Sequence, residues 1–244
     1  MHKSPLSTQQ IKAEAHRLGF SACGFARAEA VDPTSAADYR RWIAEGKHAD
    51  MNYMADHADK RMDPRLLLEG THTIVSLALN YYPIRRLSPS QYQFAYYAYG
   101  HDYHDVMKQR LRQLAQFVQT THPHIGVKIC VDTAPVHERY WAWKAGLGWI
   151  GRNHCLIIPH HGSYFFLGEL LLTATADHYD QPLPSHCGNC RQCILSCPTH
   201  ALTDDRLLNA AQCLSYLTIE YKGNHIAAPR QTHDNTYIYG CDRC

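Results

Sequence analysis

The chain has 244 residues, of which 45% are hydrophobic and 19% are charged, and its 24 Lys and Arg nearly balance its 22 Asp and Glu. These proportions are typical of a globular protein and exclude a disordered or low-complexity chain. Residues 2–6 carry no hydrophobic signal segment and no apolar run reaches about 18 residues, so we expect neither export nor a membrane span.

The sequence up to residue 131 predicts helices that alternate with strands. In chain order, the expected elements are a helix ending at Gly19, a strand over 20–25, a helix over 36–58, a strand over 73–79, a helix from Asp105 and a strand over 127–131. Met107, Leu111 and Leu114 recur at helical spacing and support the helix from Asp105. The alternation indicates an α/β fold, for which we expect a parallel sheet.

The next segment predicts one more helix and a hairpin. Thr133 can cap a helix that has Pro135 in its first turn and ends at Gly146. Residues 155–158 and 164–172 are β-rich and are expected to pair with each other as a hairpin.

The composition shifts near residue 176 towards Pro, His, Gly and Cys, which predicts a domain boundary there. We therefore expect an α/β domain over 1–175 and a smaller domain over 176–244. Ten cysteines, most of them closely spaced, indicate a reducing cytoplasm rather than a compartment with disulfides. The remaining three, in apolar surroundings, are interpreted as small core residues; they are Cys23, Cys130 and Cys155.

Asp132 directly follows the strand over 127–131 and is the first candidate for a reacting group. Ligands of parallel α/β sheets bind beyond the carboxyl ends of the strands, where this carboxyl could act as a general acid. Its position also suits a cap for the helix that begins near Pro135, and from position alone the capping role is favoured.

The smaller domain contains the spacing C-x2-C-x2-C-x3-C-P, which is typical of a [4Fe–4S] cluster in bacterial ferredoxins. The run comprises Cys187, Cys190, Cys193, Cys197 and Pro198. A zinc site normally uses two separate C-x2-C pairs, and cysteines this close cannot all form disulfides without strain, so both alternatives are less favoured.

The fourth cysteine of such a run ligates the other cluster of a two-cluster protein. One complete set of four thiolates is Cys197, Cys213, Cys241 and Cys244; the other set has only Cys187, Cys190 and Cys193. Its fourth ligand would be expected a few residues beyond Cys244, so we expect the chain to be truncated within a second cysteine run.

Several stretches together resemble the epoxyqueuosine reductase family, the cobalamin-dependent iron–sulfur enzymes of tRNA modification. They lie in order along the chain at residues 99–104 (YGHDYH), 131–139 (VDTAPVHER), 145–151 (AGLGWIG), 162–170 (GSYFFLGEL), 213–220 (CLSYLTIE) and 238–242 (IYGCD). Their joint occurrence is specific to that family, whereas the ferredoxin-like cysteine run alone is shared by many proteins.

The resemblance implies a nitroreductase-like cobalamin-binding α/β domain followed by a ferredoxin-like domain with two [4Fe–4S] clusters. It implies that electrons pass through the clusters to cobalamin, which reduces epoxyqueuosine to queuosine at the tRNA wobble position. Asp132, in the D-T-A-P stretch, would be the proton donor. The implied cofactor contacts are Arg61, Asp132, Trp149, Asn153, His154, Ser163, Ser215 and Tyr216.

The resemblance also implies partners. They are a tRNA whose anticodon loop carries epoxyqueuosine, and an electron donor such as a flavodoxin or a ferredoxin, for a monomeric cytoplasmic enzyme. The helical-repeat region that usually follows in the family is absent from the sequence. Two alternatives stay open, a corrinoid reductive dehalogenase and a ferredoxin-type electron carrier, although a carrier has no need of so large an α/β domain.

Overall fold

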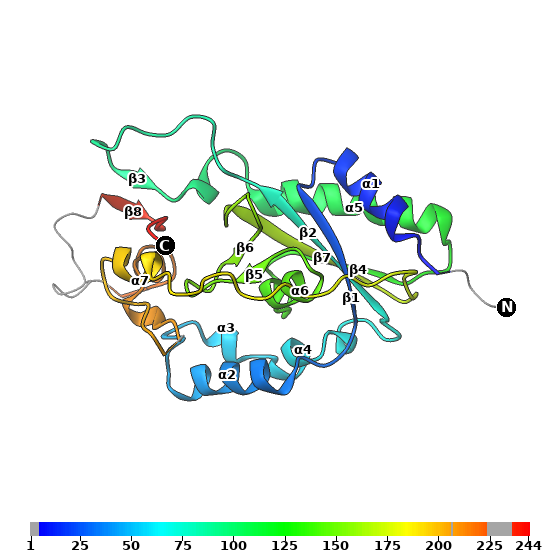
Figure 1. The fold of residues 1–244 in the computed structure, drawn as a ribbon, viewed down its shortest axis with the longest axis horizontal. Coiled ribbons are helices and arrows are strands. Elements are labelled where there is room, and N and C mark those ends of the chain that lie inside the picture. The colour runs from blue at the N-terminus through cyan, green and yellow to red at the C-terminus, as the bar shows by residue number, and fades with distance from the viewer. Residues whose placement is uncertain (1–4, 206, 224–235) are drawn as a thin grey trace.

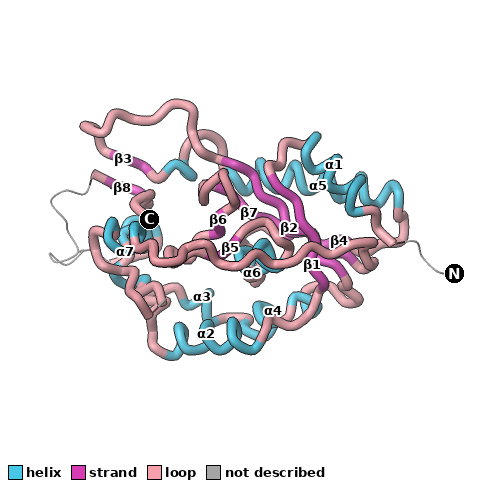
Figure 2. Tube along the Cα trace, viewed as in Figure 1, coloured by secondary structure: helices cyan, strands magenta, loops and turns pink. Residues whose placement is uncertain are grey.

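The computed structural model describes residues 5–205, 207–223 and 236–244, and the structural statements below concern these residues (Figures 1 and 2). The first part contains α1 (Thr8–Arg17), β1 (Ala22–Arg27), α2 (Pro33–Ala44), α3 (Asn52–Ala55), α4 (Ala58–Met62), β2 (Thr73–Asn80), β3 (Gln93–Phe94), α5 (Tyr103–Thr121), β4 (Val127–Cys130), α6 (Glu138–Lys144), β5 (Trp149–Ile150), β6 (Leu156–Ile157) and β7 (Phe165–Leu172). The C-terminal part contains α7 (Gln192–Ser196), α8 (Leu214–Ile219) and β8 (Tyr237–Tyr239).

The central sheet has four strands in the order β1-β2-β7-β4. Each neighbouring pair is antiparallel, so the predicted parallel sheet is wrong. Alternation of helices and strands along a sequence does not fix strand direction, because the direction depends on where the connections return the chain. Here β7 is inserted between β2 and β4, although β4 precedes it in the sequence, and it runs opposite to both.

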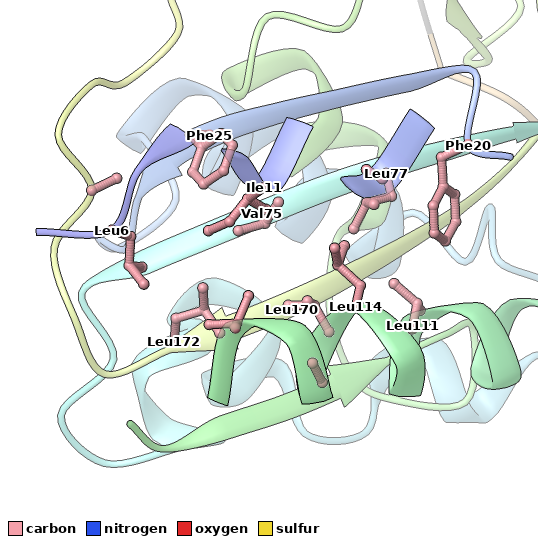
Figure 3. Packing of buried hydrophobic residues seen from close by; sticks show 14 of the residues in the cluster. Leu6, Ile11, Phe20, Phe25, Val75, Leu77, Leu111, Leu114, Leu170 and Leu172 are labelled. Carbon is pink, nitrogen blue, oxygen red and sulfur yellow. The ribbon is translucent and has the colours of Figure 1, made fainter. Parts of the chain in front are cut away.

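Helices cover both faces of the sheet, and the alternation of side chains along each strand supplies two cores. On one face, α1 and α5 pack against the strands, and Leu111 and Leu114 of α5 are fully buried against Leu170 of β7 (Figure 3). On the other face, Trp141 of α6 is fully buried against a cluster that includes Leu171. Neighbouring residues of β7 thus enter opposite cores, as the two-residue period of a strand requires.

Two predicted elements are wrong. The helix predicted over 36–58 ends at Ala44, and Gly46 follows with φ of 65°, a conformation that a helix cannot continue through. The hairpin predicted between 155–158 and 164–172 does not form either. Instead, β6 pairs with β5. Both edges of β7 are occupied by β2 and β4, so β7 has no free edge for β6.

The C-terminal part packs along α2 and α3 (Figure 1). The indole N–H of Trp42 donates to the carbonyl of Leu208 at 2.6 Å, and the Tyr216 hydroxyl donates to Asp50 at 2.7 Å. Strand β8 also pairs in parallel with β3. These contacts hold the cysteine-bearing segment against the α/β part. The predicted domain boundary near residue 176 stays a prediction.

Among the described residues, no helix has both the length and the apolar character needed to cross a membrane.

Candidate functional site

A cavity of about 1010 Å³ lies between the α/β part and the start of the cysteine-bearing segment. Asp132 and Arg61 line it from the first part, and Cys187, Gly188 and Leu208 line it from the second. Its volume is at the upper end of the roughly 300–1,000 Å³ that is usual for ligand sites. The cavity therefore suits a large ligand that contacts both parts of the chain.

Asp132 occupies a turn directly after β4, with φ of 52°, in the left-handed region that non-glycine residues rarely adopt. Thr133 does not cap a helix: both its backbone N–H and its hydroxyl donate to the carbonyl of Val131. The next helix begins only at Glu138, so the predicted helix start near Pro135 is wrong. The capping role that position favoured for Asp132 disappears with it.

The carboxylate of Asp132 belongs to a hydrogen-bonded group at the start of α5. The Tyr103 hydroxyl donates to Asp132 Oδ2 at 2.7 Å, and His104 Nε2 lies 3.2 Å from the same oxygen. On the other side of the imidazole, His104 Nδ1 lies 2.8 Å from Asp102 Oδ1. Burial and the hydrogen bond to Asp132 raise the pKa of Tyr103, so the phenol stays protonated and acts as a donor.

Glu138 lies beneath this turn and holds it from the protein side. Its Oε1 accepts the backbone N–H of Asp132 at 2.5 Å. Burial raises the pKa of Glu138 to about 7, and the nearby Asp132 carboxylate adds to the rise, although the Asp132 N–H opposes it. Glu138 therefore changes charge near neutral pH.

Four buried polar atoms on the cavity wall have no hydrogen-bond partner among the described residues. They are Arg61 Nε, His137 Nε2, Arg152 Nε and His154 Nε2. Burial, with a smaller contribution from neighbouring arginines, lowers the pKa of both His137 and His154 to about 4, so both imidazoles are neutral. Buried polar atoms are normally paired, so this wall suits a ligand that carries several polar groups. Cobalamin, with its amide side chains and phosphate, fits this donor set.

The predicted cofactor contacts separate into two groups. Arg61, Asp132 and His154 line the cavity. The other five do not line it; they are Trp149, Asn153, Ser163, Ser215 and Tyr216. Two of these join the two parts of the chain, since the Asn153 amide donates to the carbonyl of Cys244 at 2.5 Å and the Tyr216 hydroxyl donates to Asp50.

The cysteines predicted to hold the two clusters form two neighbouring groups. Burial raises the pKa of Cys241 to about 11, and the nearby thiols of Cys213 and Cys197 contribute to the shift. Burial also raises the pKa of Cys244, to which Cys155, Cys241, Cys213 and Cys197 all contribute. Burial raises the pKa of Cys193 as well, with smaller contributions from Cys187 and Cys190. Members of each predicted set thus influence one another, and Cys155, which belongs to neither set, influences Cys244 as well.

No three His, Cys, Asp or Glu side chains in the described ranges converge on a point where a single metal ion could bind. A [4Fe–4S] cluster differs from a single ion, because its thiolates surround a cubane at its corners.

No role was predicted for four residues that belong to this site, which are Tyr103, His104, Glu138 and His137. Tyr103 and His104 follow Asp102, which accepts the backbone N–H of His104 and caps α5. The sequence did carry a signal for two of them. Gly100 and the capping Asp102 mark a helix start, and Tyr103 and His104, which can both transfer protons, follow directly. Cys155 was interpreted as a core residue, yet it is only partly buried and lies near Cys193 and Cys213.

Comparison with known proteins supplies the family. The family profile described as "Epoxyqueuosine reductase QueG, DUF1730" matches residues 61–133, and the "4Fe-4S double cluster binding domain" matches residues 186–244. The epoxyqueuosine reductase of Cellulophaga algicola is 41% identical over 96% of this chain and 76% of its own. The chain belongs to the epoxyqueuosine reductase family. The predicted family and the predicted order of an α/β domain and a double-cluster domain are thereby confirmed.

Solved structures of this family agree in fold. The epoxyqueuosine reductase of Streptococcus thermophilus superposes with a TM-score of 0.87 at 31% identity, over 97% of this chain. A crystal structure of an epoxyqueuosine reductase with a tRNA-Tyr epoxyqueuosine-modified stem loop also gives 0.87, at 30% identity. This chain spans 64% and 63% of those two chains, respectively, so it corresponds to about two thirds of their length.

Proposed function

We propose that the protein reduces epoxyqueuosine to queuosine in the anticodon loop of a tRNA, with cobalamin in the cavity and electrons supplied through two [4Fe–4S] clusters. The observation that carries this proposal is that Asp132 and Cys187 line one cavity. A proton donor and a cluster ligand are thus brought to the same large ligand site. The alternative of a corrinoid dehalogenase or a simple electron carrier has no comparable support.

Each side chain at the cavity has a task that its environment supports. Asp132, exposed on its strained turn, is placed to transfer a proton to the oxygen that leaves the epoxide. His137 and His154, both neutral, offer uncharged donors to the amide groups of the cofactor. Arg61 and Arg152 offer positive charge and further N–H donors. When bound, cobalamin supplies the low-potential reductant that removes the epoxide oxygen.

The cysteines hold the clusters that bring electrons one at a time. In the proposed pairing, Cys187, Cys190 and Cys193 ligate the cluster beside the cavity, and the other is ligated by Cys197, Cys213, Cys241 and Cys244. Cys187 alone among these seven cysteines lines the cavity within the described chain, so its cluster is the proposed point of electron delivery. A flavodoxin or ferredoxin is proposed as the external donor, and a cytoplasmic monomer as the working form.

The decisive experiment supplies anaerobically reconstituted protein, carrying clusters and cobalamin, with a strong reductant and an anticodon stem-loop that contains epoxyqueuosine. Mass spectrometry of the nucleosides should show conversion to queuosine, with loss of one oxygen. Stem-loop that remains unchanged, although iron and cobalamin are present, would refute the proposal.

The matched variant is Asp132→Asn, which preserves the size of the side chain but carries no transferable proton. It should retain cobalamin and lose about 10²–10⁴-fold in turnover, which is the usual contribution of a positioned acid. Asp38→Asn, at an exposed carboxylate of α2 that also lines the cavity, tests whether loss of any cavity carboxylate has this effect. Turnover near the wild-type rate in Asp132→Asn would remove Asp132 from the chemistry.

A further inference from the structure

The hydrogen-bonded group around Asp132 includes a histidine and a second carboxylate in addition to the proposed proton donor. Asp102, His104 and Asp132 form a continuous series, with His104 Nδ1 2.8 Å from Asp102 Oδ1 and His104 Nε2 3.2 Å from Asp132 Oδ2. The outer member, Asp102, has a side chain that is 62% exposed, whereas the imidazole of His104 is only 28% exposed. The series therefore leads from solvent to the proposed proton donor.

The orientation of the imidazole is fixed by the contacts that His104 makes with Asp102 and with Tyr103. Asp102 caps α5 and accepts the backbone N–H of His104, so its carboxylate is held beside Nδ1. The ring of His104 stacks on Tyr103 at 4.0 Å between centroids. Tyr103 in turn stacks almost parallel on Phe166 of β7, at 4.3 Å. Nε2 consequently faces Asp132 because of the fold itself.

The two oxygens of Asp132 have different surroundings. Tyr103 and His104 both contact Oδ2, whereas no hydrogen bond from a described residue reaches Oδ1. One oxygen is thus occupied by the protein, and the other is left for a ligand in the cavity that Asp132 lines. A group that receives protons on one side and delivers them on the other requires this asymmetry.

We infer that His104 is the proton relay that recharges Asp132 between turnovers, with Asp102 as the residue that orients it. The inference rests on the proposed function, because Asp132 needs recharging only if it gives up a proton. Reduction of an epoxide to an alkene consumes two electrons and two protons for each oxygen released as water. A large ligand in the cavity would cover Asp132, so its lost proton has to be replaced by a group that already lies beside it, as His104 does.

The proposed step is a simple transfer. After Asp132 has given its proton to the departing oxygen, the N–H bond at Nε2 of a protonated His104 breaks and an O–H bond forms at Asp132 Oδ2. His104 becomes neutral, with its Nδ1–H still held by Asp102. After the product has left, water that reaches Nε2 through the open cavity supplies the proton that restores the imidazolium, and no other reactant is needed.

The charged and titratable groups that face this series are few. Asp102, Asp132 and Glu138 are the acids, since Glu138 interacts electrostatically with His104 and with Asp132. Lys108, one turn further along α5, acts on Asp102. Tyr103 stays protonated and cannot compete as a base.

The test compares His104→Gln with His101→Gln in the reconstituted protein, using the epoxyqueuosine stem-loop. His101 is an exposed histidine three residues earlier and has no part in the series. His104→Gln should lose about 100-fold in turnover, the lower end of what a positioned acid–base group contributes, and should keep its cobalamin and its stem-loop affinity. His104→Ala, which leaves room for a free imidazole, should regain much of its lost rate when imidazole is added, and His101→Gln should match the wild type.

A purely structural role for His104 would give a different result. Turnover of His104→Gln that equals the wild type, or a loss in His104→Ala that imidazole does not rescue, would overturn the relay. Lack of turnover in the wild type would refute the proposed function instead.

A second measurement tests the relay geometry without turnover. Proton NMR of protein with ¹⁵N-labelled histidine should show a hydrogen-bonded imidazole Nε2–H that disappears in both His104→Gln and Asp132→Ala and persists in His101→Gln, whereas an Nδ1–H held by Asp102 should persist in Asp132→Ala. Absence of the Nε2–H resonance in the wild type, or its persistence in Asp132→Ala, would contradict the relay even if the protein has no reductase activity.

Discussion

The backbone N–H of Asp132 donates a 2.5 Å hydrogen bond to the carboxylate of Glu138, six residues further along the chain. The bond holds Asp132 in a left-handed conformation that costs a non-glycine residue free energy, on the order of 1 kcal/mol. Because burial raises the pKa of Glu138 to about 7, the acceptor is charged above neutral pH and uncharged below it. Charged acceptors form the stronger hydrogen bonds.

The first prediction concerns this pH dependence. Amide hydrogen exchange over residues 131–134, corrected for the intrinsic rate at each pH, should show more protection at pH 8 than at pH 6. In Glu138→Gln the amide oxygen accepts the same N–H at both pH values, so the difference should vanish. An equal difference in the wild type and the variant would assign it to another group.

The second prediction concerns Glu169, which is fully buried in β7 and pairs in register with Ser76 of β2. Burial raises its pKa well above the ordinary value and the nearby Glu138 adds to the shift, although the Ser76 hydroxyl opposes it. The folded state therefore keeps a proton that the unfolded state releases, so the free energy of unfolding falls as pH rises, by up to about 1.4 kcal/mol per unit.

Glu169→Gln removes this titration while preserving the side-chain size. Urea unfolding at pH 5 and pH 6.5, just above the ordinary pKa of a glutamate, should show a smaller loss of stability in the variant than in the wild type. Glu138 is present in both proteins, so the difference between them reports on Glu169. Parallel losses would mean that Glu169 does not hold a proton in the fold.

The third prediction concerns the clusters. Cys213→Ser should lower the iron content after anaerobic reconstitution by about the iron of one [4Fe–4S] cluster, because the second set would lack a thiolate. Cys23→Ser is the control, since burial raises the pKa of Cys23 to about 12 and its side chain packs in the core of the α/β part. Iron content that is unchanged in Cys213→Ser would assign the second cluster another ligand.

The fourth prediction concerns the unpartnered donors of the cavity. His137→Phe keeps an aromatic ring against Tyr39, whose centroid is 4.6 Å away, but removes Nε2. Cobalamin affinity should fall about tenfold, which corresponds to one lost hydrogen bond of roughly 1.4 kcal/mol. His178→Phe, at an exposed histidine, should bind as the wild type does. Equal affinities in both variants would place the cofactor away from His137.

Local features of the structure could be predicted from the sequence. The strand over 73–79 and the helix that carries Met107, Leu111 and Leu114 are both present. They could be predicted because the spacing of apolar residues within a short segment indicates a strand or a helix. The cysteine spacing likewise indicated iron–sulfur clusters. Strand direction and the end of α2 at Ala44 were not predictable in this way.

The site itself was only partly predictable. Asp132 stood out because it follows a buried strand, but its partners Tyr103 and His104 lie 29 and 28 residues away in the sequence. Their meeting depends on how α5 packs on the sheet through Phe166, which no local spacing encodes. The unpartnered state of His137 and His154 is likewise a property of the folded cavity, and composition gives no sign of it.

The most direct test of the central claim is a determination of iron and cobalt per chain in anaerobically prepared protein incubated with cobalamin. The account predicts more iron than a single [4Fe–4S] cluster holds, together with about one tightly held cobalamin per chain. Protein that takes up zinc but neither iron nor cobalamin under these conditions would contradict it.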